Sequence, residues 1–229
     1  MIHISLSKEI TVPCPELHII ALTAKVTNTP SDERLWEEIT TEVESVRSSI
    51  SLEDVNKWEP IRATRQAYKR LGKDPNRYRP SAEALRRRIL RELPLYRIDT
   101  LVDIINLVSI KSGFSIGGFD VDKIVGNLVL GVGQANEHYE AIGRGLLNIE
   151  GLPVYRDEKG GIGTPTSDEE RTKIDIHTTN VLMIFNGYSG VSGLDDAARY
   201  AINLLKEYVL AHDFEVEYIT FESRRNIVL

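Results

Sequence analysis

The stretch RIDTLVDIINLVSIKSGFSIGGFDVDKI, residues 97–124, decides the fold class, because the character of the sequence changes within it. Residues 99–113 read as a helix, with Asp99 as the expected N-cap and Gly113 as the glycine that follows the last turn. After Gly113 the pattern changes to short apolar runs separated by glycine turns. The stretch therefore predicts a helix that leads into a sheet-rich half of the chain.

Helices are expected mainly before this stretch and strands mainly after it. The expected helices are residues 29–49, 58–75, 79–93, 99–113 and 194–212. The expected strands are residues 3–7, 17–26, 127–133, 151–157, 181–188 and 214–221. This segregation favours an α+β fold over a regular alternation of strands and helices. With no internal repeat, we expect one domain over residues 1–229, of which residues 1–60 carry no motif.

Two serines are expected to begin helices in the first half of the chain. Ser31 is the predicted N-cap of the helix at residues 29–49, and Ser81 is that of the helix at residues 79–93. The inward face of the second of these helices is expected to consist of Ala82, Leu85 and Ile89. Its outer surface is then expected to carry Arg86, Arg87 and Arg88.

The composition of the 229 residues, 41% hydrophobic and 27% charged, is that of an ordinary globular protein. We expect no membrane segment, because the sequence has no long apolar run and its start has no signal-peptide core. The single cysteine, Cys14, and five histidines without zinc-binding spacing predict neither a disulfide nor a metal site. These features favour a cytoplasmic protein, and we expect no cofactor.

Positive charge is concentrated in one segment, although the net charge of the chain is −6. Residues 62–91 contain eleven basic and two acidic side chains, a net charge of +9, whereas the remainder carries −15. Such segregation is typical of proteins that bind a polyanion. The alternative is that these side chains form solvated helix faces and pair with the acidic remainder. Charge alone leaves both interpretations open.

Polar side chains gather in residues 160–183, where glycines and a proline precede the run SDEERT at residues 167–172. This run could form the rim of an active site, with its acidic, basic and hydroxyl groups orienting a water and a polar substrate. Equally, Ser167 or Asp168 could cap a short helical turn while Arg171 pairs with nearby acids. The residues alone leave the two alternatives balanced.

Two further motifs are better explained by local structure than by chemistry. Asp120 and Asp122 have the spacing of a paired-carboxylate site, but a turn with local hydrogen bonds is the preferred interpretation. The glycines before residue 194 resemble a phosphate-binding helix start, yet they lack the Walker lysine, and Asp195 and Asp196 would repel a phosphate.

From residue 97 onward the chain resembles the B3/B4 domain of the phenylalanyl-tRNA synthetase beta subunit. The resemblance rests on an asparagine-bearing helix, a glycine, and an aromatic-Asp turn followed by Asp-Lys-Ile, and it extends over residues 61–221. The matching residues are Val102, Asp103, Asn106, Gly113, Phe119, Asp120, Asp122, Lys123 and Ile124. It implies a three-layer fold with an unusual β-sandwich core flanked by helices. In the synthetase this domain hydrolyses mischarged tyrosyl-tRNA.

The resemblance also implies which residues form the editing pocket. Asn106 matches a pocket asparagine, whereas the family's pocket histidine falls on Gly117. The family's tyrosine-selecting glutamate falls near residues 168–174, where no single residue matches it unambiguously. We therefore expect a changed pocket with uncertain tyrosine selectivity.

The resulting hypothesis is a free-standing tRNA-binding protein that hydrolyses a mis-acylated aminoacyl ester in trans. In this hypothesis the water or the carbonyl would be positioned by Asn106 and Thr172. The amino acid would be recognised by Asp168 and Glu169. Arg171 would hold a neighbouring carboxylate or the terminal phosphate. The RNA backbone would contact Arg62, Arg65, Arg86, Arg87 and Arg88. The alternatives are a binding module without catalysis, for RNA, an amino acid or a protein, and a small-molecule enzyme that reuses the pocket. The sequence does not indicate the oligomeric state.

Overall fold

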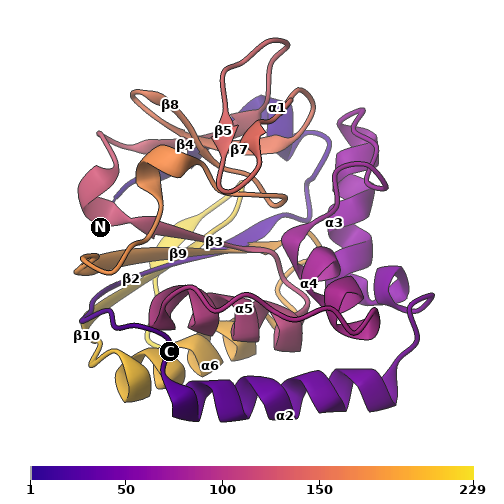
Figure 1. Cartoon of the computed structure of the whole chain (residues 1–229). Helices are drawn as coiled ribbons and strands as arrows, with labels where there is room; N and C mark the ends of the chain where they lie inside the picture. The colour runs from indigo at the N-terminus through magenta and orange to yellow at the C-terminus, as the bar shows by residue number, and fades with distance from the viewer. Residues whose placement is uncertain (1) are drawn as a thin grey trace.

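Two stacked β-sheets form the centre of the molecule. The computed structural model describes residues 2–229. Within them one sheet has the strand order β11-β10-β2-β9-β3 and the other has the order β1-β4-β7-β8. The smaller sheet lies above the larger one in Figure 1. The strands are β1 (Ile4–Leu6), β2 (His18–Lys25), β3 (Ile116–Asp120), β4 (Leu128–Val132), β5 (Glu140–Ala141), β6 (Gly145–Leu146), β7 (Pro153–Asp157), β8 (Gly160–Gly163), β9 (Asn180–Gly187), β10 (His212–Ile219) and β11 (Arg224–Asn226).

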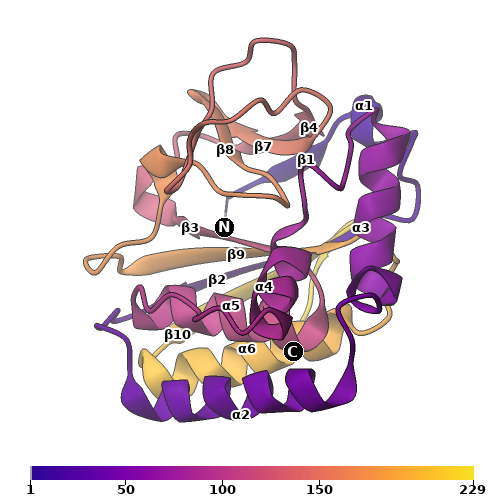
Figure 2. The same ribbon diagram turned by 45° about the vertical axis from the view of Figure 1, so that its right-hand side comes forward.

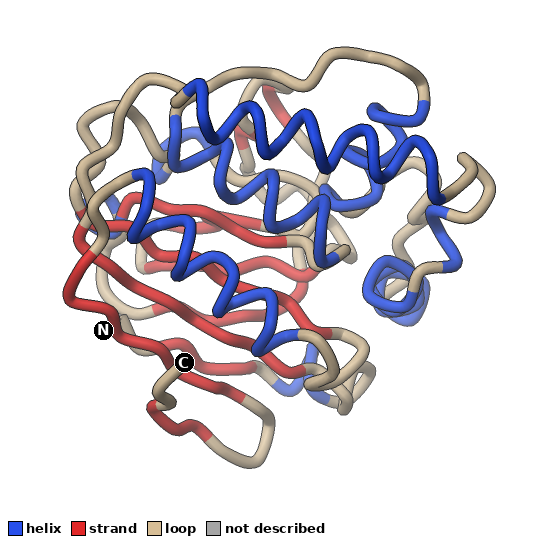
Figure 3. Tube along the Cα trace, turned by 90° about the horizontal axis from the view of Figure 1, so that it is seen from below, coloured by secondary structure: helices blue, strands red, loops and turns tan. Residues whose placement is uncertain are grey.

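Helices cover the face of the larger sheet that points away from the smaller one. Helices α5 and α6 pack on this face, and α2 packs against α5 from outside (Figures 1 and 3). Helices α3 and α4 stand at one side of the sandwich (Figure 2). The helices are α1 (Lys8–Thr11), α2 (Glu33–Ser49), α3 (Glu59–Arg70), α4 (Ser81–Leu90), α5 (Thr100–Ser112) and α6 (Leu194–Tyr208), and the 3₁₀ turns are η1 (Val55–Lys57), η2 (Val121–Lys123) and η3 (Glu170–Thr172). The predicted α+β fold with a β-sandwich core is confirmed.

Strand β2 shows why the apolar runs of this sequence are continuous rather than alternating. It pairs with β10 on one side and with β9 on the other, so it lies inside the larger sheet. Ile20 and Leu22 point into the core beneath the helices, whereas Ile19 and Ala21 point into the core between the sheets. Successive side chains alternate between faces, and both faces are covered, so every position favours an apolar residue. The first 60 residues thus supply the central strand of the larger sheet.

The ends of α5 are those predicted from the sequence. The side chain of Asp99 accepts a hydrogen bond from the backbone N–H of Val102 over 2.9 Å. Gly113 ends the helix with φ = 77°, where a Cβ atom would lie 2.6 Å from the ring of Trp58. A glycine is therefore needed both for the left-handed conformation and for the close approach of the tryptophan.

Both predicted serine caps are wrong. Asp32, one residue later than predicted, caps α2 by accepting hydrogen bonds from the backbone of Arg34 and Leu35. The hydroxyl of Ser31 instead donates to the buried carboxylate of Asp103 on α5. At α4, Pro80 takes the cap position and Ser81 is the first helical residue. The residue types alone do not show which of two neighbouring residues, Ser31 or Asp32 and Pro80 or Ser81, takes the cap position.

Candidate functional site

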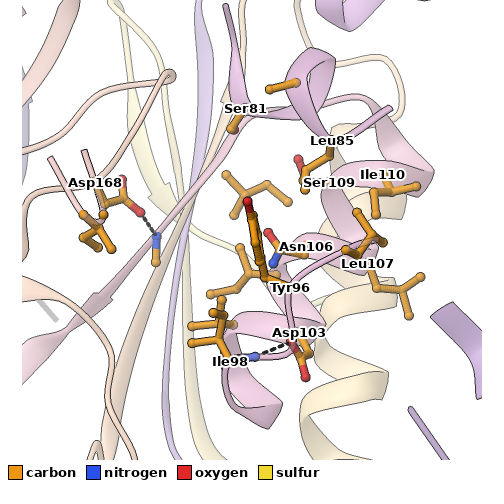
Figure 4. A pocket seen from close by; sticks show the side chains of 18 of the residues that line it. Ser81, Leu85, Tyr96, Ile98, Asp103, Asn106, Leu107, Ser109, Ile110 and Asp168 are labelled. Atoms are coloured by element: carbon orange, nitrogen blue, oxygen red, sulfur yellow. Dashed lines mark hydrogen bonds between the residues drawn. The ribbon is translucent and has the colours of Figure 1, made fainter. Parts of the chain in front are cut away.

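A cavity of about 1120 Å³ lies between α4, α5 and the edge of the larger sheet. Strand β3 is the last strand in the order of this sheet, where it pairs with β9, and it forms this edge. The segments at residues 91–98, 142–144, 166–168 and 173–176 complete the wall, and Figure 4 shows side chains that line it. This volume slightly exceeds the usual range for small-molecule pockets of about 300–1,000 Å³. The cavity can therefore hold a ligand larger than a free amino acid.

Helix α5 brings Asn106 to the cavity. Val102, Asn106 and Ile110 follow one another at the four-residue spacing of a helix face, and all three line the cavity. The side-chain amide of Asn106 is half-buried and makes no hydrogen bond with any other residue in the range 2–229. Its donor and acceptor therefore remain available to a ligand.

Asp103, one turn before Asn106, connects α5 to the segment that closes the cavity. Its buried carboxylate accepts hydrogen bonds from the indole Nε1 of Trp36 over 2.7 Å and from the backbone N–H of Ile98 over 3.3 Å. The bond to Ile98 is drawn in Figure 4. These bonds satisfy the buried carboxylate of Asp103, and the bond to Ile98 anchors the end of the segment at residues 95–98.

Asp168 reaches the cavity from another wall, at the edge of β3. Its carboxylate accepts a hydrogen bond from the backbone N–H of Gly118 over 3.1 Å (Figure 4), and its carbonyl oxygen accepts one from Ile142 over 3.0 Å. Burial of the carboxyl raises the pKa of Asp168 to about 7, against the smaller opposing effect of the Gly118 hydrogen bond. Near neutral pH the group is therefore present in both protonation states.

Interlocking hydrogen bonds hold the loop before Asp168 in place. The Thr164 hydroxyl oxygen accepts hydrogen bonds from the backbone of Thr166 and Ser167. Tyr139 donates its hydroxyl to the carbonyl oxygen of Ser167 over 2.6 Å, and the backbone N–H of Ser81 donates to the carbonyl of Pro165 over 2.8 Å. The second bond joins this loop to the start of α4, so two walls of the cavity are fixed relative to each other.

Gly117, the position that resembles the family's histidine, lies beside Asp168. A Cβ atom here would come within 2.7 Å of the Phe119 ring and 3.6 Å of Asp168 Oδ1. Phe119 is fully buried in the core between the two sheets. In this chain the space for a side chain at residue 117 is thus occupied by an aromatic ring.

The remaining predicted pocket residues, Glu169, Arg171 and Thr172, do not line the cavity. Arg171 donates two hydrogen bonds of 2.9 Å to the buried carboxylate of Asp157, so it holds a carboxylate neighbour. Glu169 accepts from the backbone N–H of Arg171 and begins η3. Thr172 is completely buried, and its hydroxyl has no hydrogen-bond partner among residues 2–229. All three support the segment that follows Asp168.

Asp120 and Asp122 form a turn, as preferred from the sequence. Asp120 accepts hydrogen bonds from the backbone of Asp122 and from the Thr178 hydroxyl. Among residues 2–229 no group of three or more His, Cys, Asp or Glu side chains is arranged to hold a metal ion.

The placement of Arg86 on the outer surface is wrong. Arg86 is buried, its guanidinium lies 3.6 Å from the ring centroid of Trp58, and its Nε donates to the carbonyl oxygen of Ile110 over 2.8 Å. The residues of α4 that are buried are Ala82, Glu83, Arg86 and Ile89. Arg86 thus satisfies a carbonyl in the last turn of α5, and it is not available to a phosphate.

Most of the other arginines predicted to bind RNA pair with acids of the same chain. Arg65 and Arg87 both bind Glu83, whose side chain is completely buried, at 2.8 Å and 2.7 Å. Arg62 is exposed and pairs with Glu59. Arg88 lines the cavity, with its guanidinium 4.1 Å from the ring centroid of Tyr96. Three of the five arginines predicted to bind RNA therefore form salt bridges within the chain, in line with the alternative that the charge pattern left open.

Among the residues of the cavity wall that the sequence did not indicate are Tyr96, Arg79, Arg91 and Arg144. Tyr96 exposes 66% of its surface, and the three arginines are exposed as well. Arg79 and Arg91 belong to the basic segment and to the predicted helix at residues 79–93, whereas α4 spans Ser81–Leu90 and leaves both just beyond its ends. Arg144 lies in a loop far along the chain, so only the fold brings it here.

The family model of the B3/4 domain matches residues 63–209, which include both α5 and the Asp168 segment. The chain belongs to the B3/4 domain family. The match includes α4 and α6, whereas β2 and α2 precede it.

A solved structure with a similar fold is an N-terminal fragment of the phenylalanyl-tRNA synthetase beta subunit from Pyrococcus horikoshii. The TM-score is 0.52 at 13% sequence identity, over 99% of this chain and 54% of that one. The chain thus spans about half the length of the fragment. No curated protein matches the sequence. None of the helices in residues 2–229 has the length and apolar character to span a membrane.

Proposed function

We propose that this B3/4 protein binds the aminoacylated end of a tRNA in the cytoplasm and hydrolyses a mis-acylated ester in trans. The observation that carries the proposal is that Asn106 and Asp168 line the same cavity from different walls. The family membership supports the proposal, because the similar solved structure belongs to a tRNA synthetase subunit.

In the proposed reaction Asp168 acts as the general base. Its carboxylate takes a proton from a water molecule, and the water oxygen attacks the ester carbonyl carbon. The Asn106 amide donates a hydrogen bond to the carbonyl oxygen, on which negative charge develops. The tetrahedral intermediate then expels the ribose oxygen, which takes the proton back, and a free amino acid and a tRNA hydroxyl result. A pKa of about 7 suits this role, because a general base is most effective when its pKa is close to the working pH.

Thr172, Glu169 and Arg171 have supporting roles in this proposal. Since none of them lines the cavity, they hold the chain that follows Asp168 rather than contact the substrate. The amino acid would be selected instead by the apolar part of the wall, which includes Leu85, Ile105 and Ile110. The proposal therefore favours a substrate with an apolar or aromatic side chain.

A binding module without catalysis is the second candidate, and the glycine at residue 117 favours it. That position offers no side chain to the reaction, and the Phe119 ring occupies the adjacent space. Deacylation assays on a panel of mischarged tRNAs separate the two candidates. The enzyme hypothesis predicts turnover of at least one mischarged tRNA and its loss in Asp168→Asn. Binding without turnover of any tRNA in the panel would establish the binding module.

A further inference from the structure

The mouth of the cavity carries an exposed aromatic ring that contacts an arginine. Tyr96 exposes 66% of its surface although the guanidinium of Arg88 lies 4.1 Å from its ring centroid. Arg88 is itself held, because its Nε donates a hydrogen bond to the carbonyl oxygen of Pro94. One face of the ring is thus covered by a cation, and the exposure must come from the other face and the edges. An exposed aromatic ring with one face covered by a cation can stack on a planar ligand with its other face.

Three arginines around the same mouth have no acidic partner. The side chains of Arg79, Arg91 and Arg144 are exposed, and they make neither an ion pair nor a hydrogen bond with any residue in the range 2–229. Elsewhere in the basic segment, Arg62 and Arg65 are each paired with a glutamate. Arg79 and Arg91 thus carry charges of this segment that no acidic side chain pairs with, and Arg144 adds a third such charge from outside the segment.

The acids of the cavity wall do not cancel this charge at close range. Asp99 and Asp103 are buried and accept hydrogen bonds from backbone groups of α5 and of its preceding segment. Asp175 pairs with Lys123 at 2.6 Å, and the burial that raises the pKa of Asp168 favours its neutral form. The mouth thus offers positive charge outside and polar groups inside.

We propose that this mouth is a docking site for the single-stranded 3′ end of an RNA, with a base stacked on Tyr96 and the backbone phosphates bound by Arg79, Arg91 and Arg144. The inference rests on the proposed function for its orientation, because the end of the RNA must enter the cavity to reach Asn106 and Asp168. Within the basic segment the RNA contact then lies on Arg79 and Arg91, at the two ends of α4, and Tyr96 and Arg144 add to it from outside the segment.

The spacing of the arginines favours a chain of phosphates over a single anion. Arg79 precedes α4 and Arg91 follows it, so the ten residues of the helix lie between them. At 1.5 Å per residue they span about 15 Å, more than one phosphate group bridges. Base stacking together with spaced cations is the combination by which proteins bind single-stranded RNA.

The test measures binding of an unacylated, fluorescently labelled single-stranded RNA oligonucleotide by anisotropy, so that no hydrolysis is involved. Tyr96→Ala is expected to weaken binding about 5- to 150-fold, the equivalent of about 1–3 kcal/mol for a stacked base. Tyr96→Phe keeps the ring and is expected to bind like the wild type. Circular dichroism of each variant confirms that it is folded.

Charge reversals test the phosphate contacts with a matched control. Arg91→Glu is expected to weaken binding and to reduce the slope of log K against log salt concentration by about 0.7, the value for one lost phosphate contact with a single strand. Arg199→Glu, on the exposed surface of α6 and outside the cavity wall, makes the same charge change and is expected to leave binding within about twofold.

Three results would each overturn the inference. The first is wild-type affinity in Tyr96→Ala, and the second is an equal loss of RNA affinity in Arg91→Glu and Arg199→Glu. The third is that the wild-type protein does not bind the RNA. The failure of the inference is distinguishable from that of the proposed function. A protein that binds RNA through Tyr96 but deacylates no tRNA contradicts the enzyme alone, whereas deacylation that is insensitive to Tyr96→Ala contradicts the docking site alone.

Discussion

The backbone N–H of Gly118 donates to the carboxylate of Asp168 over 3.1 Å, at the free edge of the larger sheet. An edge strand leaves N–H groups unpaired, and here an acidic side chain takes one of them in place of a further strand. The same bond fixes the carboxylate at the wall of the cavity. Strand β3 thus both ends the sheet and positions the residue to which we assign the chemistry.

Asp168→Asn should stabilise the folded protein at neutral and alkaline pH. The pKa of Asp168 is raised from 3.8 to about 7, so the folded state resists ionisation of the carboxyl. The raised pKa does not change the free energy of unfolding of the wild-type protein below about pH 4, where the carboxyl is protonated in both states. Between about pH 4 and pH 7 it lowers that free energy increasingly as the pH rises. Asparagine never ionises but can still accept the Gly118 hydrogen bond. Thermal melts at pH 4, 6 and 8 should show the variant gaining on the wild type as the pH rises; a gain that shrinks with pH would contradict the assignment.

Arg86→Ala should destabilise the protein through its structure rather than through RNA binding. The change removes the contact with Trp58 and leaves the Ile110 carbonyl without its charged donor. We expect the free energy of unfolding to fall by about 2–4 kcal/mol. The matched control is Arg91→Ala, an exposed arginine just beyond the same helix, with an expected change within about 0.5 kcal/mol. Equal effects of the two variants in urea unfolding would refute the buried role of Arg86.

Glu83→Gln tests the buried salt-bridge network that Glu83 forms with Arg65 and Arg87 of the basic segment. Glu83 is completely buried between Arg65 and Arg87, so its loss leaves two poorly hydrated guanidinium groups without a counter-charge. We expect a loss of about 3–5 kcal/mol in the free energy of unfolding. Glu59→Gln, which removes an exposed pair with Arg62, should cost at most about 1 kcal/mol. Urea titrations of both variants provide the comparison, and a small effect at Glu83 would speak against a buried network.

Gly117→His should not restore the family's histidine to a working position. The new Cβ would lie 2.7 Å from the Phe119 ring, so the two side chains compete for one space. We expect a loss of about 1–3 kcal/mol from overpacking, measured by urea unfolding, and no gain in deacylation. In combination with Phe119→Ala the cost of the histidine should shrink, because the smaller residue makes room. Strictly additive effects would show that the ring is not the obstacle.

The sequence predicted where helices and strands lie better than it predicted which side of each element is buried. The apolar spacing and the Asp99 and Gly113 signals located α5, because these features depend on the local chain alone. The face of α4 that is buried could not be predicted in the same way. A buried Glu83 with two arginines and an Arg86 stacked on a tryptophan place charged residues where periodicity expects apolar ones. Only the tertiary structure shows that these charges are paired.

The cavity could be predicted only in part for a related reason. Asn106 and Asp168 were chosen through the resemblance, and they line one cavity although they lie 62 positions apart in the sequence. Glu169 was chosen through the resemblance as well, and Arg171 and Thr172 were chosen as members of the polar run at residues 167–172. A 3₁₀ turn after Asp168 directs them toward Asp157 and the core instead. Tyr96 and Arg144 come from loops, whose place in the wall is set by the packing of distant elements.

The most direct test of the central claim is the pH dependence of single-turnover deacylation of a mischarged tRNA. The account predicts a rate that rises with pH and levels off above about pH 7, as Asp168 ionises. It predicts a loss of about 10²- to 10⁴-fold in Asp168→Asn with the pH dependence abolished, and a loss of about 10²- to 10³-fold in Asn106→Ala with the pH dependence retained. A wild-type rate profile that Asp168→Asn leaves unchanged would contradict the account.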